Sequence, residues 1–150
     1  VISKTNFTIA DTIIWKKKSA LPNNVSHNKL TRICEFVFVF CRKDEFKSFT
    51  ANKPVSKVRD TGQVYYKNVF NFVEAKNNDG MCKLKKATYS TELIEKLLDL
   101  YVKENSIVYD PFMGTGTTAI ACINKNINYI GSEISNAQVE YANDRIKNNK

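Results

Sequence analysis

The residues best suited to chemistry form one short stretch from Asp110 to Thr118, with the sequence Asp-Pro-Phe-Met-Gly-Thr-Gly-Thr-Thr. The apolar run 107–109 before it predicts a strand, and residues 117–124 predict a helix. The two glycines allow a tight turn and a close approach of the backbone to a ligand. Free N–H groups at the start of the helix favour a negatively charged group. The stretch is therefore a candidate ligand loop at the carboxyl end of a strand, where open α/β sheets bind ligands.

Glu133 follows the next predicted strand, one β-α-β unit after the loop. A carboxylate there can accept hydrogen bonds from both ribose hydroxyls of an adenosine-containing ligand. A phosphate-binding P-loop is excluded because it requires a lysine directly after a glycine, and no glycine in this sequence is followed by one. The dinucleotide fingerprint G-x-G-x-x-[GA] is met by Gly114, Gly116 and Ala119, so a nicotinamide cofactor is one hypothesis.

S-Adenosyl-L-methionine is the second ligand that this stretch suits. Asp110 can pair with its ammonium group, the threonines at the helix start can hold its carboxylate, and Phe112 can lie beside its adenine or sulfonium. A turn with a purely structural role is the third interpretation. It is disfavoured because the glycines, the acidic residue and the strand-to-helix junction occur together.

The elements expected to position the loop follow a regular order. Ser90 is a candidate N-cap, and apolar residues at helical spacing predict a helix that ends at Asn105. The elements expected after it are a strand over 107–109, a helix over 117–124, a strand over 127–130 and a helix over 137–147. This order predicts a parallel sheet with a right-handed crossover.

The first half of the chain contains two predicted strands and a basic loop. Thr12–Trp15 is a β-branched and aromatic run that ends at three lysines, and a polar loop over 19–31 follows. Glu35–Phe40 is apolar from its second residue onward, which predicts a strand buried on both faces. Residues 43–80 are irregular and mix lysines with aromatic residues. That mixture fits contact with phosphates and bases, or equally a small aromatic cluster with solvated lysines.

Net charge is distributed unevenly along the chain. The 150 residues carry a net charge of +8, which favours a polyanionic partner. Residues 1–86 contain 17 basic and 7 acidic side chains, a balance of +10, whereas residues 87–150 contain 6 and 8, a balance of −2. A lysine-rich genome would explain the total but not this asymmetry. The sequence therefore predicts a basic first half that contacts a partner and a near-neutral second half.

Several classes of protein are excluded by the same sequence. The longest apolar run is strand-sized, so we expect no membrane span, and no signal peptide is visible near the start. The four cysteines form no C-x-x-C pair and there is one histidine, so we expect neither a metal site nor a disulfide framework. Reduced cysteines fit a cytoplasmic protein. The first residue is Val, which we interpret as the start of a fragment.

The loop resembles the D-P-F-x-G-[ST]-G-T-T cofactor motif of DNA amino-methyltransferases, which modify adenine N6 or cytosine N4. Ile130–Ile134 resembles the acidic ribose-binding motif of that family. Trp15-Lys16, Pro22 and the run Glu35–Phe40 resemble pieces of its catalytic domain. The order of these pieces is similar to the circularly permuted β-class.

The resemblance implies an α/β fold, a Rossmann-like parallel or mixed sheet of the AdoMet methyltransferase type, incomplete at the N-terminus. It divides the chain into catalytic-domain strands with a basic DNA-facing loop (1–43), a target-recognition region (44–82) and an AdoMet-binding β-α-β unit (83–150). The implied contacts to S-adenosyl-L-methionine are Asp110, Phe112, Gly114, Thr115, Gly116, Thr117, Thr118 and Glu133. The implied contacts to double-stranded DNA are Lys16, Lys17, Lys18, Lys29 and Arg32.

Two departures from the family pattern matter. Residues 85–90 replace the usual H-P-x-x-[KF]-P, although Tyr89 still offers an aromatic ring to the pocket. The catalytic signature [DSN]-P-P-[YFW], which holds the target amine and stacks on the flipped base, is absent because the sequence has no Pro-Pro pair.

We therefore expect the carboxy-terminal portion of an adenine-N6 DNA methyltransferase, inactive without an N-terminal half or a second chain. The alternatives are a cytosine-N4 enzyme, an RNA or small-molecule methyltransferase, a catalytically silent DNA-binding remnant and, last, a nicotinamide-dependent dehydrogenase.

Overall fold

The computed structural model describes residues 4–20, 27–80 and 88–149. Pro22, Lys85 and Lys86, which entered the family resemblance, lie outside these ranges. The chain forms two compact units, residues 1–74 and 75–150. Each is described by itself.

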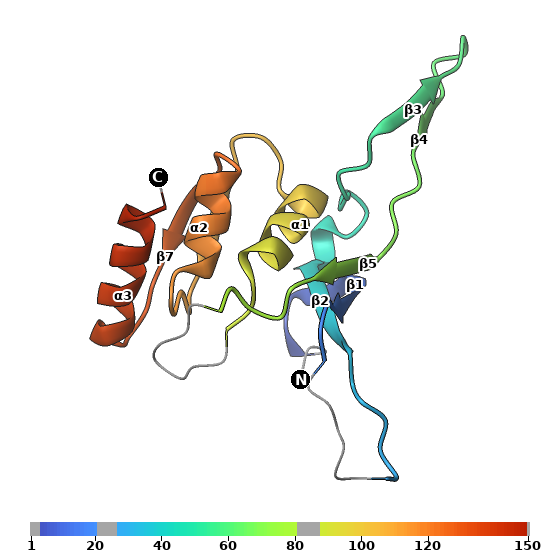
Figure 1. Cartoon of the computed structure of the whole chain (residues 1–150). Helices are drawn as coiled ribbons and strands as arrows, with labels where there is room; N and C mark the ends of the chain where they lie inside the picture. Colours follow the sequence, from blue (N-terminus) through green and yellow to red (C-terminus); the bar gives the residue numbers. More distant parts are fainter. Residues whose placement is uncertain (1–3, 21–26, 81–87, 150) are drawn as a thin grey trace. The chain divides into compact units, whose positions relative to one another are not determined.

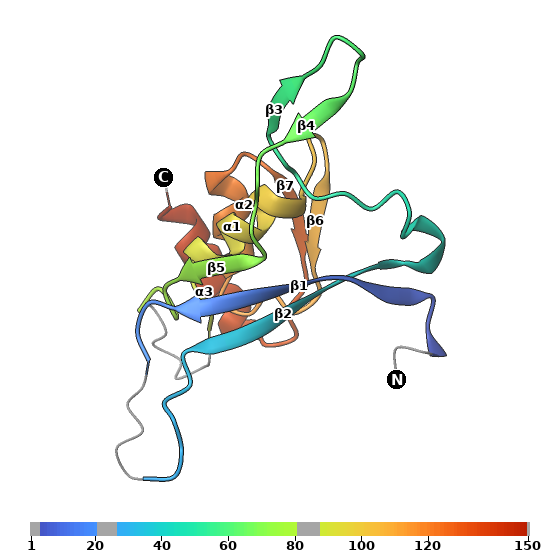
Figure 2. The ribbon, with the colours of Figure 1, turned by 90° about the vertical axis from the view of Figure 1, so that its right-hand side faces the viewer.

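A three-stranded sheet in the order β2-β1-β5 organises the first unit (Figures 1 and 2). The strands are β1 (Phe7–Lys17), β2 (Cys34–Arg42) and β5 (Phe72–Ala75). β1 and β2 run antiparallel over nine residue pairs, with a bulge between Ile9 and Asp11. Ile13 and Trp15 on β1 are buried, so one face of this strand forms the core of the unit.

The prediction that residues 35–40 are buried on both faces is wrong for the described structure. β2 alternates between exposed and half-buried positions. Phe36, Phe38 and Phe40 project from one face, and their side chains are exposed, with neighbouring rings 6.4–6.5 Å apart. The physical reason is that β2 belongs to an antiparallel sheet, in which one face can remain uncovered.

Residues 43–80 are more regular than their composition predicts. A 3-10 turn over Lys43–Glu45 follows β2, and β3 (Val55–Val58) and β4 (Val64–Tyr66) form a separate antiparallel hairpin (Figure 1). Most residues of this hairpin are exposed. A half-buried strand is recognised in a sequence by alternating apolar and polar residues. The exposed strands of this hairpin have no buried face that would require such alternation.

The second unit is a parallel β-α-β arrangement with an additional helix at each end. It contains α1 (Thr91–Tyr101), β6 (Ile107–Asp110), α2 (Thr117–Asn124), β7 (Asn128–Gly131) and α3 (Asn136–Lys147). β6 pairs in parallel with β7, as predicted, and Figure 1 shows α2 beside β7. Leu98, Ala121 and Cys122 form the centre of the core between α1 and α2.

The boundaries of β6, α2, β7 and α3 lie within one residue of the predicted ones. The Ser90 hydroxyl caps α1 by accepting a hydrogen bond from the Leu93 N–H at 3.2 Å. α1 ends at Tyr101 rather than at Asn105, whose φ of 61° places it in the turn before β6. No described helix is long and apolar enough to cross a membrane. Within the described residues, no group of histidine, cysteine and carboxylate side chains has the arrangement of a metal site.

Candidate functional site

The ligand loop lies between β6 and α2, in two left-handed glycine turns. Gly114 has φ 54° and Gly116 has φ 80°, a region that other residues rarely adopt. The Met113 N–H donates to the Ser132 carbonyl at 2.8 Å, and the Ser132 N–H donates to the Asp110 carbonyl at 3.0 Å. The backbone that follows β7 therefore fixes the start of the loop.

Asp110 holds the loop from inside. Its Oδ1 accepts the Phe112 N–H at 2.9 Å, and its Oδ2 accepts the Thr118 hydroxyl at 2.6 Å. The Tyr89 hydroxyl lies 3.4 Å from the same Oδ2 and 3.1 Å from Thr118 Oγ1. A carboxylate has about four lone-pair positions, so Asp110 can still accept from a ligand cation while it anchors the loop.

Tyr89 belongs to the site although its segment lacks the family pattern. Burial raises the pKa of Tyr89 above its ordinary value, and the nearby Asp110 carboxylate adds to this, while the hydrogen bond with Thr118 opposes it. The hydroxyl therefore keeps its proton at neutral pH. An aromatic residue just before a helix is a weak signal in a sequence, and only the fold brings Tyr89 to Asp110.

Glu133 is the second carboxylate of the loop. Its Oε2 accepts the Gly114 N–H at 2.9 Å, and its Oε1 accepts the Ser135 N–H at 2.9 Å. The Gln138 side-chain amide lies 3.5 Å from Oε1. Each carboxylate oxygen thus accepts one backbone N–H, and further lone pairs remain that can face a pair of hydroxyl groups.

The remaining loop residues differ in exposure. Phe112 is 84% exposed, so its ring is available to a flat ligand. Thr115, Thr117 and Thr118 are buried, and the Thr117 and Thr118 side chains form hydrogen bonds within the protein. Backbone N–H groups of the first turn of α2, rather than these hydroxyls, are therefore the groups suited to a ligand carboxylate.

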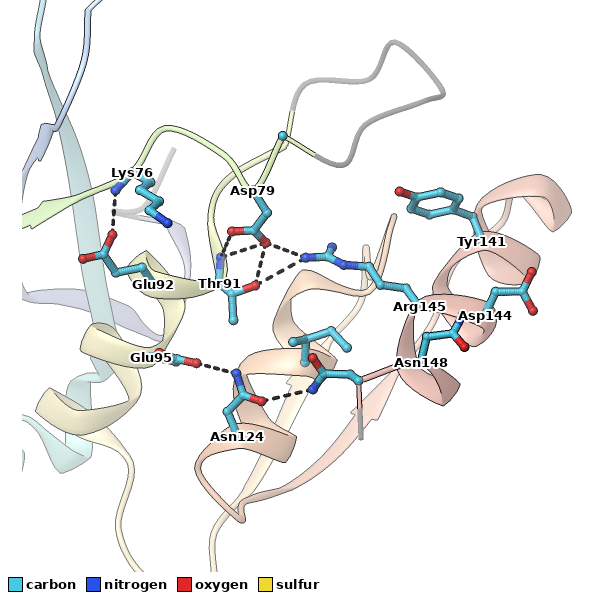
Figure 3. Close-up of a pocket in the computed structure, with 13 residues that line it drawn as sticks. Lys76, Asp79, Thr91, Glu92, Glu95, Asn124, Tyr141, Asp144, Arg145 and Asn148 are labelled. Carbon is cyan, nitrogen blue, oxygen red and sulfur yellow. Dashed lines mark hydrogen bonds and ion pairs between the residues drawn. The ribbon is translucent and has the colours of Figure 1, made fainter.

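A charged network connects the helices with the loop, and Figure 3 shows the part of it formed by Arg145, Asp79 and Thr91. Arg145 on α3 donates to the Thr115 carbonyl at 3.3 Å and to Thr117 Oγ1 at 3.0 Å. Its other nitrogen forms an ion pair with Asp79, which also accepts the Thr91 N–H at 3.0 Å. Asp79 and Arg145 are 66 residues apart, so no local pattern could have revealed this contact.

A cavity of about 760 Å³ adjoins this network on the helix side (Figure 3). It is lined by residues of α1, α2, α3 and the segment before α1, including Asp79, Glu95, Tyr141 and Arg145. None of the eight predicted cofactor residues lines it. The cavity and the ligand loop are therefore different features of this unit.

The predicted DNA contacts lie in the first unit, and two of them already pair with carboxylates of the protein. Lys16 pairs with Glu74 at 2.7 Å, and Lys17 pairs with Glu35 and lies 5.3 Å from the Trp15 ring centre. The other predicted DNA contacts, Lys18, Lys29 and Arg32, are exposed. The two lysines of the strand end thus already have carboxylate partners.

Comparison with known proteins identifies the family. A model of the DNA methylase family of N6 and N4 methyltransferases matches residues 1–144. The chain belongs to this family. It is 30% identical to the orphan methyltransferase M.BamHII of Bacillus amyloliquefaciens over 95% of this chain, and 28% identical to the type II methyltransferase M.Cfr9I of Citrobacter freundii over 90%. The chain spans 63% of the length of M.BamHII and 43% of M.Cfr9I.

Solved structures confirm the predicted fold class. The complex of M1.HpyAVI with SAM superposes with a TM-score of 0.71 at 27% identity, covering 96% of this chain and 64% of that one. The PvuII cytosine-N4-specific DNA methyltransferase gives a TM-score of 0.71 at 21% identity, covering 96% and 53%, and is similar in fold alone. This DNA methylase chain therefore has the α/β, Rossmann-like fold of AdoMet methyltransferases.

Proposed function

We propose that this chain provides the cofactor- and DNA-binding parts of an AdoMet-dependent DNA methyltransferase that modifies the exocyclic amine of adenine. The observation that carries the proposal is the loop itself. Asp110 and Glu133, from the ends of two parallel strands, both hold its backbone and keep lone pairs for a ligand. Adenine is preferred to cytosine because it is the commoner target in the family that the sequence resembles.

The proposed cofactor contacts follow from the chemistry of these groups. The Asp110 carboxylate suits the ammonium group, and the Glu133 carboxylate suits the two ribose hydroxyls. The first turn of α2 suits the carboxylate, and the exposed Phe112 ring suits the adenine face. The bound cofactor supplies an electrophilic methyl group. Family membership and the 27% identity to a protein solved with SAM support this choice of cofactor.

The remaining parts of the proposal concern DNA. Residues 1–43 and 44–82 carry the excess of positive charge, which suits a phosphate backbone, and we assign target recognition to 44–82. The signature that holds the target amine is not present in residues 1–150. We therefore expect methyl transfer to require that signature from a preceding segment or a second chain.

Calorimetric titration with S-adenosylhomocysteine tests the cofactor assignment. Wild-type protein is expected to bind it, and Asp110→Ala is expected to weaken binding at least ~10-fold because a charge-assisted contact and a loop anchor are both lost. Asp99→Ala is the matched control, since Asp99 is an exposed carboxylate of the same unit whose side chain pairs with Lys125, at the far end of α2 from the loop residues 110–116. Binding of NAD without binding of S-adenosylhomocysteine would contradict the proposal and favour the dehydrogenase.

Transfer of labelled methyl groups to duplex DNA, followed by nucleoside mass spectrometry, tests the reaction. The expected product is N6-methyladenine, formed only when the amine-holding signature is supplied. N4-methylcytosine would refute the choice of base. Absence of any product with the signature supplied, while cofactor analogue and DNA both bind, would instead support a catalytically silent DNA-binding remnant.

A further inference from the structure

The hairpin β3–β4 ends in a tight turn from Arg59 to Gln63. The Arg59 N–H donates to the Gln63 carbonyl at 3.0 Å, and the Gly62 N–H donates to the Arg59 carbonyl at 2.8 Å. Gly62 has φ 81°, and a Cβ built on it would meet nothing within 4 Å. The backbone of the tip is thus closed by its own hydrogen bonds and leaves the side chains around it open to a partner.

One face of the hairpin carries groups that can recognise a nucleic acid. Lys57 lies opposite Tyr65 in the strand register, with its ammonium 5.2 Å from the ring centre. The Arg59 guanidinium lies 4.8 Å from the same ring centre. The Tyr65 hydroxyl donates to Gln63 Oε1 at 3.3 Å. One face of the hairpin therefore carries Tyr65 with an arginine, a lysine and a glutamine around its ring. The opposite face of the hairpin carries Val58 and Val64.

Within the described part of the chain, no carboxylate pairs with the cations of this segment. Residues 46–73 contain five basic side chains and a single acidic one, Asp60. All of these residues are described, and none of the five cations forms an ion pair with a carboxylate there. Lys16 and Lys17 differ in this respect, because each is paired with a glutamate. The unpaired cations, rather than those of the strand end, are the better phosphate-binding groups.

We propose that the β3–β4 hairpin enters the major groove of duplex DNA, where Arg59 and Gln63 contact base edges and Lys57 contacts a phosphate. This inference rests on the proposed function and assigns sequence recognition within it. A two-stranded ribbon fits the major groove of B-DNA. Arginine donates two hydrogen bonds to guanine, and glutamine pairs with adenine through both of its amide atoms. The hairpin thus places both kinds of reading group on one face of a ribbon.

Duplex DNA suits this surface better than a protein partner does. A protein that covered the valine face would leave the Lys57–Arg59 side facing solvent without a function. The Tyr65 ring also holds the arginine near the tip before binding, which reduces the entropy lost on contact. An isolated two-stranded hairpin is only marginally stable in water, so contact with a groove would also order it.

Selection of sequences from a duplex pool with a randomised centre tests this assignment on the whole chain. Wild-type protein is expected to enrich a motif that contains guanine and adenine at fixed positions. Arg59→Ala and Arg59→Lys are both expected to lose preference at the guanine by about 5- to 150-fold, because a lysine keeps the charge but not the fork. Gln63→Ala is expected to lose the adenine preference by a similar factor, without loss of affinity for unselected DNA.

Lys47→Ala is the matched control, since Lys47 is an exposed cation of the same unit outside the hairpin and pairs with no carboxylate among the described residues. It is expected to weaken binding to all sequences alike and to leave the motif unchanged. Titration with S-adenosylhomocysteine verifies the fold of each variant and tests the proposed function separately. The hairpin assignment is overturned if the Arg59 and Gln63 variants bind this ligand normally and still enrich the wild-type motif. It is also overturned if wild-type protein that binds the ligand enriches no motif.

Discussion

Arg145 joins three parts of the second unit, so replacing it with alanine has a calculable cost. The change removes its ion pair with Asp79 and its hydrogen bonds to the Thr115 carbonyl and to Thr117. The two charged side chains are 12% and 22% exposed, which makes this a largely buried pair. Breaking a buried pair costs roughly 3–5 kcal/mol. Because Asp79 keeps its hydrogen bonds from Thr91, we expect about 2–3 kcal/mol.

A double-mutant cycle with Asp79 separates the pair from other effects. Urea unfolding of Arg145→Ala, Asp79→Ala and the double variant, followed by the helical signal in far-UV circular dichroism, gives the free energies. This signal reports the second unit, since α1, α2 and α3 all lie there. We expect a coupling energy of about 1–3 kcal/mol between the two residues. Arg145→Lys should recover part of it, because the charge remains and the fork is lost.

The same variants should weaken S-adenosylhomocysteine binding, because the Thr115 carbonyl and the Thr117 side chain lose the donor that fixes them. The reasoning is refuted if Arg145→Ala unfolds within about 0.5 kcal/mol of the wild type. A coupling energy near zero would refute the ion pair alone. Normal ligand binding by a destabilised Arg145→Ala would show that the network supports the helices and not the loop.

Three further predictions concern the same unit. Burial raises the pKa of Tyr89, so the unfolded chain loses this proton first as the pH rises past about 10, and the wild type should lose stability there more steeply than Tyr89→Phe. Gly116→Ala should cost about 1–2 kcal/mol from its φ of 80° alone, and more because its Cβ would lie 3.1 Å from the Ala142 Cβ. Leu98→Ala should cost about 2–4 kcal/mol in urea unfolding, because Leu98 is buried against Ala121 and Cys122.

Each of these three has a direct control. If the free energy of unfolding falls equally steeply with pH for the wild type and for Tyr89→Phe above pH ~10, the Tyr89 proton is not linked to folding. Gly80→Ala carries similar backbone strain, with φ 68° and no atom within 4 Å, so equal costs at Gly80 and Gly116 would remove the role of Ala142. Val139→Ala, at a site 36% exposed, should cost less than Leu98→Ala, and an equal cost would contradict the assigned core.

The carboxy-terminal half could be predicted well because its signals are local. The helix over 117–124 has the predicted bounds, since two glycines precede it and a turn follows it. The α1 cap at Ser90 and the parallel pairing of β6 with β7 also follow from short-range patterns. The hairpin β3–β4 gave no such signal, because its side chains are exposed on both faces.

The apolar composition of residues 35–40 led to a wrong prediction of burial for β2. The apolar run at Phe36, Phe38 and Phe40 predicts burial on both faces, whereas the structure leaves these rings exposed on an antiparallel sheet. Hydrophobicity measures how favourable burial would be, and does not state which neighbour provides it. Only the arrangement of the other strands decides that point.

The sequence by itself determined the candidate ligand loop, its carboxylates Asp110 and Glu133, and the basic character of the first half. These depend on residue types within a few positions of one another, which a chain of any fold would retain. The tertiary structure decided which distant groups meet: Tyr89 with Asp110, and Arg145 with Asp79. Such contacts depend on chain closure and strand register, which are set by the packing of the whole unit rather than by local sequence.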